Sequence, residues 1–134
     1  MSTLELGAIY SAGFEATPTL AEKVLGIEFS GTGDMNAIAL LSEYLKQVHL
    51  EALRLNVVEV SCDLQKLVFM NSSCFKSFVV WIDTVKNAPA PYQIRFLTDP
   101  RLHWQRRSLE ALRRLAVNVV TRFCAPMAAS EVSK

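Results

Sequence analysis

The feature that most constrains the fold is a change of hydrophobic period in the middle of the chain. Residues 57–64 (VVEVSCDL) carry β-branched residues on both faces, which is typical of a buried strand. One face of this segment holds Val58, Val60, Cys62 and Leu64. From residue 73 to 86 the apolar positions recur at helical spacing instead, at Phe75, Phe78, Val79, Ile82 and Val85. A buried strand leading into an amphipathic helix predicts an α/β domain, with helices expected on both faces of the sheet.

The alternation of strand and helix continues along the rest of the chain. The predicted strands are 7–16, 23–30, 57–64, 92–98 and 117–122, and the predicted helices are 35–55, 73–86 and 104–116. This order favours a single domain over residues 1–134, with a core over about 7–123 and a mainly parallel central sheet of about four to five strands with three main helices. The tail 125–134 is small and polar, and we expect it to fray.

Turn residues set the expected ends of these segments. Thr17-Pro18 is expected to close the first strand, Asp34 to cap the first helix, and Asn56 to end it. The apolar stretch 65–70 is expected to link the central strand to its helix. Right-handed crossovers would then bring the C-terminal ends of the strands, and the helix N-termini after them, to one edge of the sheet.

Composition argues against several classes of function. Hydrophobic residues make up 51% of the chain and the net charge is +1, so we expect neither a nucleic-acid partner nor a membrane-surface one. No apolar run reaches the length of a membrane span. The three cysteines and two histidines lack metal-ligand spacing. We therefore expect a cytoplasmic protein with reduced thiols, without a metal or cofactor; an acidic metal pair of Asp34 and Asp63 is the disfavoured alternative.

Adjacent hydroxyls occupy the expected junction between strand and helix, in the sequence Asn71-Ser72-Ser73. An exposed helix N-terminus has unpaired N–H groups and a partial positive charge, so it accommodates negative charge. A serine here is either a helix cap or a site that gains charge by phosphorylation. Local chemistry alone favours the cap, although two adjacent hydroxyls exceed what capping requires.

Catalysis at the same junction is weakly supported. A serine nucleophile needs an adjacent base and usually a glycine-flanked elbow, and no glycine flanks these serines. Cys74 falls on the first helical turn, where the helix dipole could activate it. A buried small hydrophobic residue is the favoured interpretation of Cys74. We therefore expect no catalytic residue and no enzyme.

The predicted helix 104–116 has a basic face. Its charged residues share one arc of about 120° at 100° per residue; they are Arg106, Arg107, Glu110, Arg113 and Arg114. The apolar residues fall opposite, at Trp104, Leu109, Leu112 and Leu115. A solvated face is the favoured interpretation, and the alternative is a basic docking face for an acidic partner.

Residues 58–82 (VEVSCDLQKLVFMNSSCFKSFVVWI) resemble the centre of STAS domains, the fold of bacterial anti-sigma-factor antagonists. In that family a strand with an aspartate leads through a short apolar link into Asp-Ser-Ser-Gly and an apolar helix. Asp63 matches the strand aspartate, residues 67–70 the link and Ser72-Ser73 the serine pair. The resemblance extends in element order over about residues 24–122, without the fourth helix that usually ends the domain.

The resemblance implies a regulatory binding protein that switches partners. Its partners would be a serine/threonine protein kinase of the anti-sigma-factor type, a cognate phosphatase and a signalling target. The implied phosphorylation site is Ser72, with Ser73 as second choice and supporting cap. The implied partner-binding surface comprises Asn71, Ser72, Ser73, Lys76 and Asp34.

Two departures from the family pattern bear on the partner. Asn71 replaces the usual aspartate and Cys74 the usual glycine. An Asn followed by hydroxyls resembles a divergent STAS-like branch whose members, phosphorylated at this site, bind a diguanylate cyclase. A further alternative is a scaffolding or self-assembling STAS protein, including a homodimer, because the apolar fraction is high.

Overall fold

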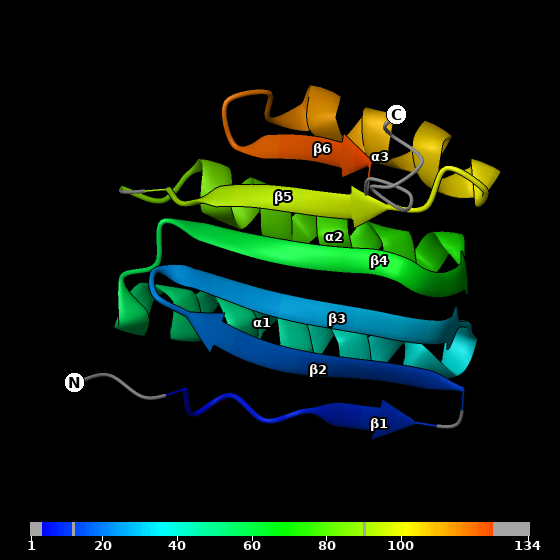
Figure 1. The fold of residues 1–134 in the computed structure, drawn as a ribbon, viewed down its shortest axis with the longest axis horizontal. Helices are drawn as coiled ribbons and strands as arrows, with labels where there is room; N and C mark the ends of the chain where they lie inside the picture. Colours follow the sequence, from blue (N-terminus) through cyan, green and yellow to red (C-terminus); the bar gives the residue numbers. More distant parts are fainter. Residues whose placement is uncertain (1–3, 12, 90, 125–134) are drawn as a thin grey trace, which may run out of the picture.

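The computed structural model describes residues 4–11, 13–89 and 91–124, which form one six-stranded sheet and three α-helices (Figure 1). The strands are β1 (Ile9–Ser11), β2 (Phe14–Ala21), β3 (Val24–Gly33), β4 (Glu59–Met70), β5 (Gln93–Thr98) and β6 (Val120–Cys124). The helices are η1 (Met35–Ala37), a single 3₁₀ turn, and α1 (Ile38–Leu55), α2 (Ser72–Lys86) and α3 (His103–Leu115). The predicted α/β class and the three main helices are confirmed.

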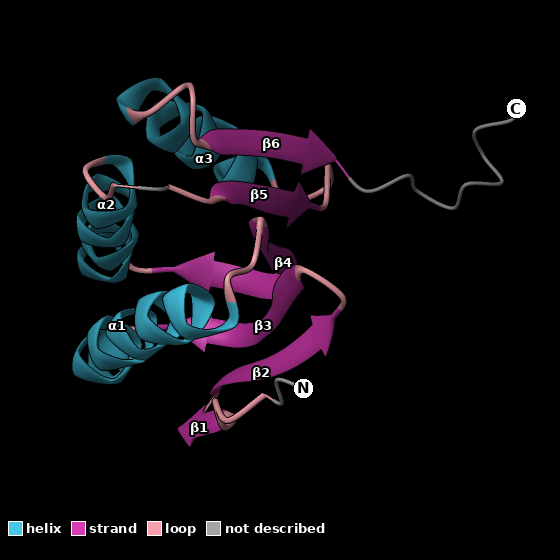
Figure 2. Ribbon diagram, turned by 90° about the vertical axis from the view of Figure 1, so that its left-hand side faces the viewer, coloured by secondary structure: helices cyan, strands magenta, loops and turns pink. Residues whose placement is uncertain are grey.

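The strands follow one another across the sheet in sequence order, β1-β2-β3-β4-β5-β6. The first three are joined by antiparallel pairing, whereas β3, β4, β5 and β6 run parallel to one another. Because the parallel strands never reverse their order, right-handed crossovers place every connecting helix on the same side. Figure 2 shows α1, α2 and α3 together on one face of the sheet.

The expectation of helices on both faces is therefore wrong. Val60, Cys62 and Leu64 of β4 point to the helices and are fully buried, as the alternation predicts. The side chains that alternate with them, Glu59, Ser61 and Asp63, are partly exposed on the other face. Val58 lies before the strand and is 61% exposed. The polar residues of the second face indicate a sheet covered on one side.

The sheet has more strands than the four to five predicted, because the predicted strand 7–16 is a hairpin. Gly13, with a φ of 81°, turns the chain between β1 and β2. Thr17 and Pro18 do not close a strand but lie within β2, where Pro18 pairs with Ile27 of β3. On its other side β2 pairs with β1 only as far as Ala16. Pro18 therefore has a paired strand on one side only, where the absence of an amide hydrogen is tolerated.

The central strand is longer than predicted, since β4 continues through the expected link to Met70. Its register against β3 shifts twice, once between Asp63 and Lys66 and once between Leu67 and Phe69. At the second shift Leu67 faces Gly31 and Phe69 faces Thr32, so Val68 is an extra residue. Such bulges break the alternation of buried and exposed residues, which is why the sequence pattern ends early.

The helices lie close to their predicted bounds and bury the predicted faces. In α1 the buried residues include Leu41, Leu45, Val48 and Ala52, and Asn56 ends the helix in the left-handed conformation. In α2, Phe78, Ile82 and Val85 are buried, and Phe75 and Val79 pack partly against the core. In α3, Leu109 and Leu112 are buried, but Leu115 is 45% exposed. The expected tail 125–134 and the position of a fourth helix lie outside the described residues.

Candidate functional site

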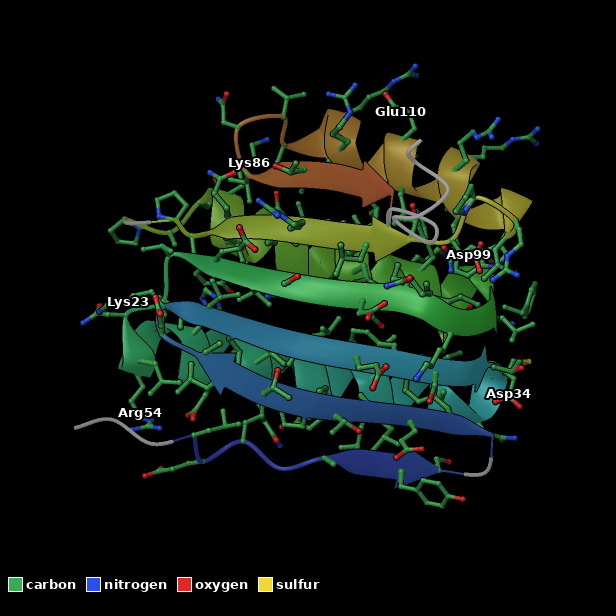
Figure 3. All side chains as sticks on the ribbon, viewed as in Figure 1. Lys23, Asp34, Arg54, Lys86, Asp99 and Glu110 are labelled. Carbon is green, nitrogen blue, oxygen red and sulfur yellow. The ribbon has the colours of Figure 1, made fainter. Side chains whose placement is uncertain are left out.

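The C-terminal ends of β3 and β4 bring the predicted site residues together. Gly33 ends β3 directly opposite Met70, the last residue of β4. The next residues stay joined, since the Asn71 amide donates to the Gly33 carbonyl at 2.6 Å. Asp34 follows Gly33, and Ser72 and Ser73 follow Asn71. Figure 3 shows Asp34 at this edge of the sheet, on the same side as Asp99 and opposite Lys23 and Arg54.

Asn71 is the N-cap of α2. Its backbone is extended, with φ −64° and ψ 147°, and its side-chain Oδ1 accepts a hydrogen bond from the Ser73 amide at 2.7 Å. The expectation that Ser73 serves as the supporting cap is therefore wrong, because the cap position belongs to the residue two places earlier. Ser72 is the first helical residue and is exposed, while Ser73 is partly buried. The Ser72 hydroxyl is thus free of a capping role.

Asp34 stabilises the neighbouring turn. Its Oδ1 accepts from the Asn36 amide at 2.9 Å, which makes it the N-cap of η1 and confirms its predicted capping role. Its backbone carbonyl accepts a hydrogen bond from the Cys74 thiol, with an Sγ–O distance of 3.3 Å. The start of α2 is therefore attached to the start of the η1–α1 segment.

Cys74 is a buried part of this junction. Its side chain has no exposed surface, and burial together with the charge of Asp34 raises the pKa of its thiol. A thiol that is buried, protonated and bonded to a carbonyl is a poor nucleophile. The structure supports the interpretation of Cys74 as a small core residue.

Two residues of α3 hold the bulged end of β4, and sequence reasoning did not identify either role. Gln105 is fully buried; its Nε2 donates to the carbonyls of Leu64 at 2.6 Å and Leu67 at 3.1 Å. Its Oε1 accepts from the Asp99 amide at 3.0 Å. Trp104 Nε1 donates to the Val68 carbonyl at 2.8 Å. A glutamine on the apolar face of a helix was the available signal, since a buried amide needs partners.

These bonds replace a missing strand partner. The pairing of β4 with β5 ends at Asp63, opposite Leu97, so the carbonyls beyond that point have no partner in β5. Buried carbonyls without partners are unfavourable, and the side chains of α3 supply the hydrogen bonds instead. The end of β4, which leads into Ser72, is thus positioned by α3.

The basic face of α3 divides into two halves. Arg113 and Arg114 both pair with Glu110, at 2.7 Å and 3.7 Å. Arg106 and Arg107 are exposed, and no acidic side chain of the described residues lies within ion-pair distance of either. The predicted docking face is therefore partly neutralised by Glu110 at the far end of the helix and remains more strongly cationic at the end near β4.

Large apolar side chains are exposed at the same edge. Val68 is 59% exposed, Phe69 51% and Met35 73%. Phe69 precedes Ser72 by three residues, a separation of at most about 10 Å along the chain. Lys76, one helical turn after Ser72, is also exposed. Within the described residues, the edge combines an exposed hydroxyl, exposed apolar groups and cations without a carboxylate at ion-pair distance, a combination that also occurs in protein interfaces.

The structure does not bring the acidic metal pair together. Asp63 lies inside β4 opposite Glu28, and its Oδ1 accepts from the backbone and side chain of Gln65. Asp34 follows the end of β3, six residues beyond Glu28. Across the described part of the chain, no group of three or more His, Cys, Asp and Glu residues is placed to hold a metal ion. No described helix is long and apolar enough to cross a membrane.

Comparisons with known proteins bear on the fold. No protein-family model matches the sequence, and no curated protein sequence matches it. Among solved structures, the chain is similar to an anti-sigma factor antagonist from Mycobacterium paratuberculosis, with a TM-score of 0.64 at 14% identity over 90% of this chain and 95% of the other. It is also similar to the unphosphorylated form of the anti-sigma factor antagonist SpoIIAA, with a TM-score of 0.51 at 13% identity over 89% and 95%. The chain therefore has the STAS fold, the fold of these anti-sigma factor antagonists.

Proposed function

We propose that this chain is a non-enzymatic bacterial regulator that binds a protein partner at the edge formed by Asp34, Asn71, Ser72, Ser73 and Lys76, and that phosphorylation of Ser72 ends the binding. A kinase of the anti-sigma-factor type would move the γ-phosphoryl group of a nucleoside triphosphate onto Ser72 Oγ, which breaks the bond between the β- and γ-phosphates and releases the nucleoside diphosphate and the hydroxyl proton. A phosphatase would return the phosphoryl group to water. The target is a signalling protein: an anti-sigma factor or, in the STAS-like branch with Asn71, a diguanylate cyclase.

The observation that carries the proposal is the free Ser72 hydroxyl. Because Asn71 caps α2, Ser72 is exposed without a capping role in the helix. An exposed hydroxyl can enter a kinase active site without unfolding of the chain. The comparison with a structure of SpoIIAA described as the unphosphorylated form supports a phosphorylation switch on this fold.

The physical effect of phosphorylation follows from the position of Ser72. A phosphoserine carries a charge of about −1.5 to −2. At the first residue of a helix, the partial positive charge of the N-terminus stabilises such a group by about 0.3–1 kcal/mol, and α2 has no acidic residue in its first turn. The fold therefore tolerates the phosphate, whereas a partner packed against Ser72 meets new charge and bulk.

Among the side chains that the structure describes at this edge, none forms a pair of nucleophile and base. Cys74 is buried and its pKa is raised. The imidazole of His49 lies on α1 and shares a hydrogen bond with Tyr92, at 2.7 Å, so it is engaged inside the domain. Binding is the function that this arrangement supports best.

The test is partner capture with matched variants. Wild-type chain, Ser72→Ala, Ser72→Asp and Thr84→Asp are used as bait in lysate of the native host, and the captured protein is identified by mass spectrometry, purified and titrated. Thr84→Asp is the control, because it adds the same charge to α2 about 18 Å farther along the helix. We expect wild type, Ser72→Ala and Thr84→Asp to bind alike and Ser72→Asp to bind at least about tenfold more weakly. Equal affinity of Ser72→Asp and Thr84→Asp would refute the switch.

A further inference from the structure

The end of β4 carries an exposed apolar pair whose position is fixed by the fold. Val68 is the extra residue of the second bulge, and both Val68 and Phe69 are more than half exposed. Two consecutive exposed apolar residues are unusual in a strand, where neighbours point to opposite faces. The Val68 carbonyl is held by Trp104 Nε1 at 2.8 Å, so this pair is attached to the first turn of α3.

Two exposed cations lie on the first turns of the helices that begin at this edge, Lys76 on α2 and Arg107 on α3. Arg107 lies one turn after Trp104 on α3 and about 60° away from it around the helix axis, at the border between the basic and the apolar face, because three residues return the helix by about 300°. Lys76 lies one turn after Ser72 on α2. Arg107 and Lys76 are exposed, and within the described ranges no carboxylate lies at ion-pair distance from either. By contrast, Arg113 and Arg114 at the other end of α3 share Glu110.

We propose that Val68, Phe69, Trp104, Arg107 and Lys76 form a docking surface for a protein segment that carries both apolar and acidic side chains. The apolar side chains of that segment would cover Val68 and Phe69, and its carboxylates would pair with Arg107 and Lys76. Charge complementarity identifies the occupant, since Arg107 and Lys76 have no carboxylate at ion-pair distance among the residues that the structure describes. The inference rests on the proposed function in one respect: it names the chemistry of the partner that this edge binds.

A protein segment fits this surface better than a nucleic acid. Sequence-independent binding of nucleic acid requires many phosphate contacts and open aromatic faces. The whole chain has a net charge of +1, and Trp104 is partly buried with its N–H already bonded. Two cations beside an exposed aliphatic and an aromatic side chain instead resemble the polar rim and apolar centre of a protein interface.

The docking surface also explains how phosphorylation of Ser72 would weaken partner binding. Residues four apart on a helix are neighbours, so a phosphate on Ser72 reaches Lys76. The phosphate would take the place of a partner carboxylate at Lys76 and repel the other carboxylates of the same segment. Phosphorylation would thereby weaken docking by competition for a cation, in addition to steric exclusion.

The test uses the full-length ¹⁵N-labelled chain and three synthetic probes in an NMR titration. The first probe is an amphipathic helical peptide with leucines on one face and glutamates on the other. The second has lysine in place of every glutamate, and the third is a single-stranded oligonucleotide. We expect the acidic peptide to shift the amide signals of Val68, Phe69, Lys76 and Arg107 in a saturable manner, and the lysine peptide to leave them unchanged.

Matched variants locate the binding. Arg107→Glu is compared with Arg114→Glu, which makes the same change on the same helix, and Phe69→Ser is compared with Val117→Ser, where Val117 is 61% exposed at the other end of α3. We expect the first substitution of each pair to weaken binding of the acidic peptide at least about tenfold. The second substitution should change the affinity for this peptide less than about twofold. The spectrum of each variant shows whether it is folded.

Three results would overturn the inference: shifts outside this surface or none at all, equal effects within a pair, or an oligonucleotide that saturates the same amides more tightly than the peptide. These results are independent of the switch, because the chain is unphosphorylated. If Ser72→Asp binds its captured partner like wild type while Arg107→Glu does not, the docking surface holds and the proposed switch fails. The converse result overturns the docking surface and leaves the switch in place.

Discussion

The helices α2 and α3 begin at the same edge of the sheet, yet their first turns are built in opposite ways. At α2, Asn71 caps the helix from outside and the next residue, Ser72, faces solvent. At α3, no side chain caps the helix; Trp104 and Gln105 turn back to hold the carbonyls of β4. The first turn of α2 therefore leaves Ser72 exposed, whereas the first turn of α3 supports the end of β4.

The largest expected effect comes from breaking the support. Gln105→Ala would leave the buried carbonyls of Leu64 and Leu67 and the amide of Asp99 without their partner, which costs about 2–4 kcal/mol. Urea unfolding should show this loss, and hydrogen exchange should accelerate in residues 64–70. Gln93→Ala is the control, because Gln93 is exposed and the described contact of its side chain is a single hydrogen bond to the Asn118 carbonyl, while its backbone bond to Val58 does not depend on the side chain. Equal losses in the two variants would contradict the supporting role.

Removal of the α2 cap should have a smaller effect. Asn71→Ala deletes the acceptor for the Ser73 amide and should reduce the free energy of unfolding by about 1 kcal/mol. Asn71→Asp should retain the stability, because aspartate caps equally well and adds favourable charge at the helix start. If Asn71→Ala is neutral and Ser73→Ala is destabilising in the same urea experiment, the cap has been assigned to the wrong residue.

Substitution of Ser72 itself should hardly change stability. Ser72→Ala removes a hydroxyl that is not a cap and should shift the free energy of unfolding by less than about 0.5 kcal/mol. Ser72→Asp should raise it by about 0.3–1 kcal/mol through the helix dipole. Thermal unfolding measures both. A loss of about 1 kcal/mol in Ser72→Ala would show that Ser72 is structural.

A pH effect is expected away from this edge. Burial lowers the pKa of His49, and its Nδ1 shares a hydrogen bond with the Tyr92 hydroxyl, which also accepts from Trp81 Nε1 at 3.1 Å. Because the pKa is lower in the folded state, stability should fall as the pH drops through the unfolded value near 6.5. In His49→Gln the urea midpoint of unfolding should change less between about pH 7.5 and 5.5 than it does in the wild-type chain. An unchanged pH profile would contradict the assignment to His49.

The sequence predicted both helix starts to within one residue, but it did not predict the supporting role of α3, for a physical reason. The N-cap preference of Asn and Ser, the strand before it and the helical period after it are all local signals. The role of Gln105 depends on residues about 40 positions away. It arises because β4 extends beyond the last residue that pairs with β5. Such a long-range need for hydrogen-bond partners has no signature in the local period.

The hairpin of β1 and β2 and the bulges of β4 were hidden for related reasons. A turn at Gly13 and a proline inside β2 both resemble the end of a strand in the sequence. The bulge at Val68 shifts the register by one residue, so that two neighbouring apolar residues become exposed. The prediction of Ser72 as a site rests on family resemblance, because local chemistry alone favoured a cap, whereas the exposed apolar pair at the end of β4 required the register of the sheet.

The central claim is that charge on Ser72 ends partner binding while the fold is preserved. The most direct measurement is the affinity of the captured, purified partner for the chain with phosphoserine incorporated at position 72, compared with the unmodified chain by calorimetry. We predict that the phosphorylated chain binds at least about tenfold more weakly, while its NMR spectrum differs only near α2 and the end of β4. Equal affinity of the two forms would contradict the account.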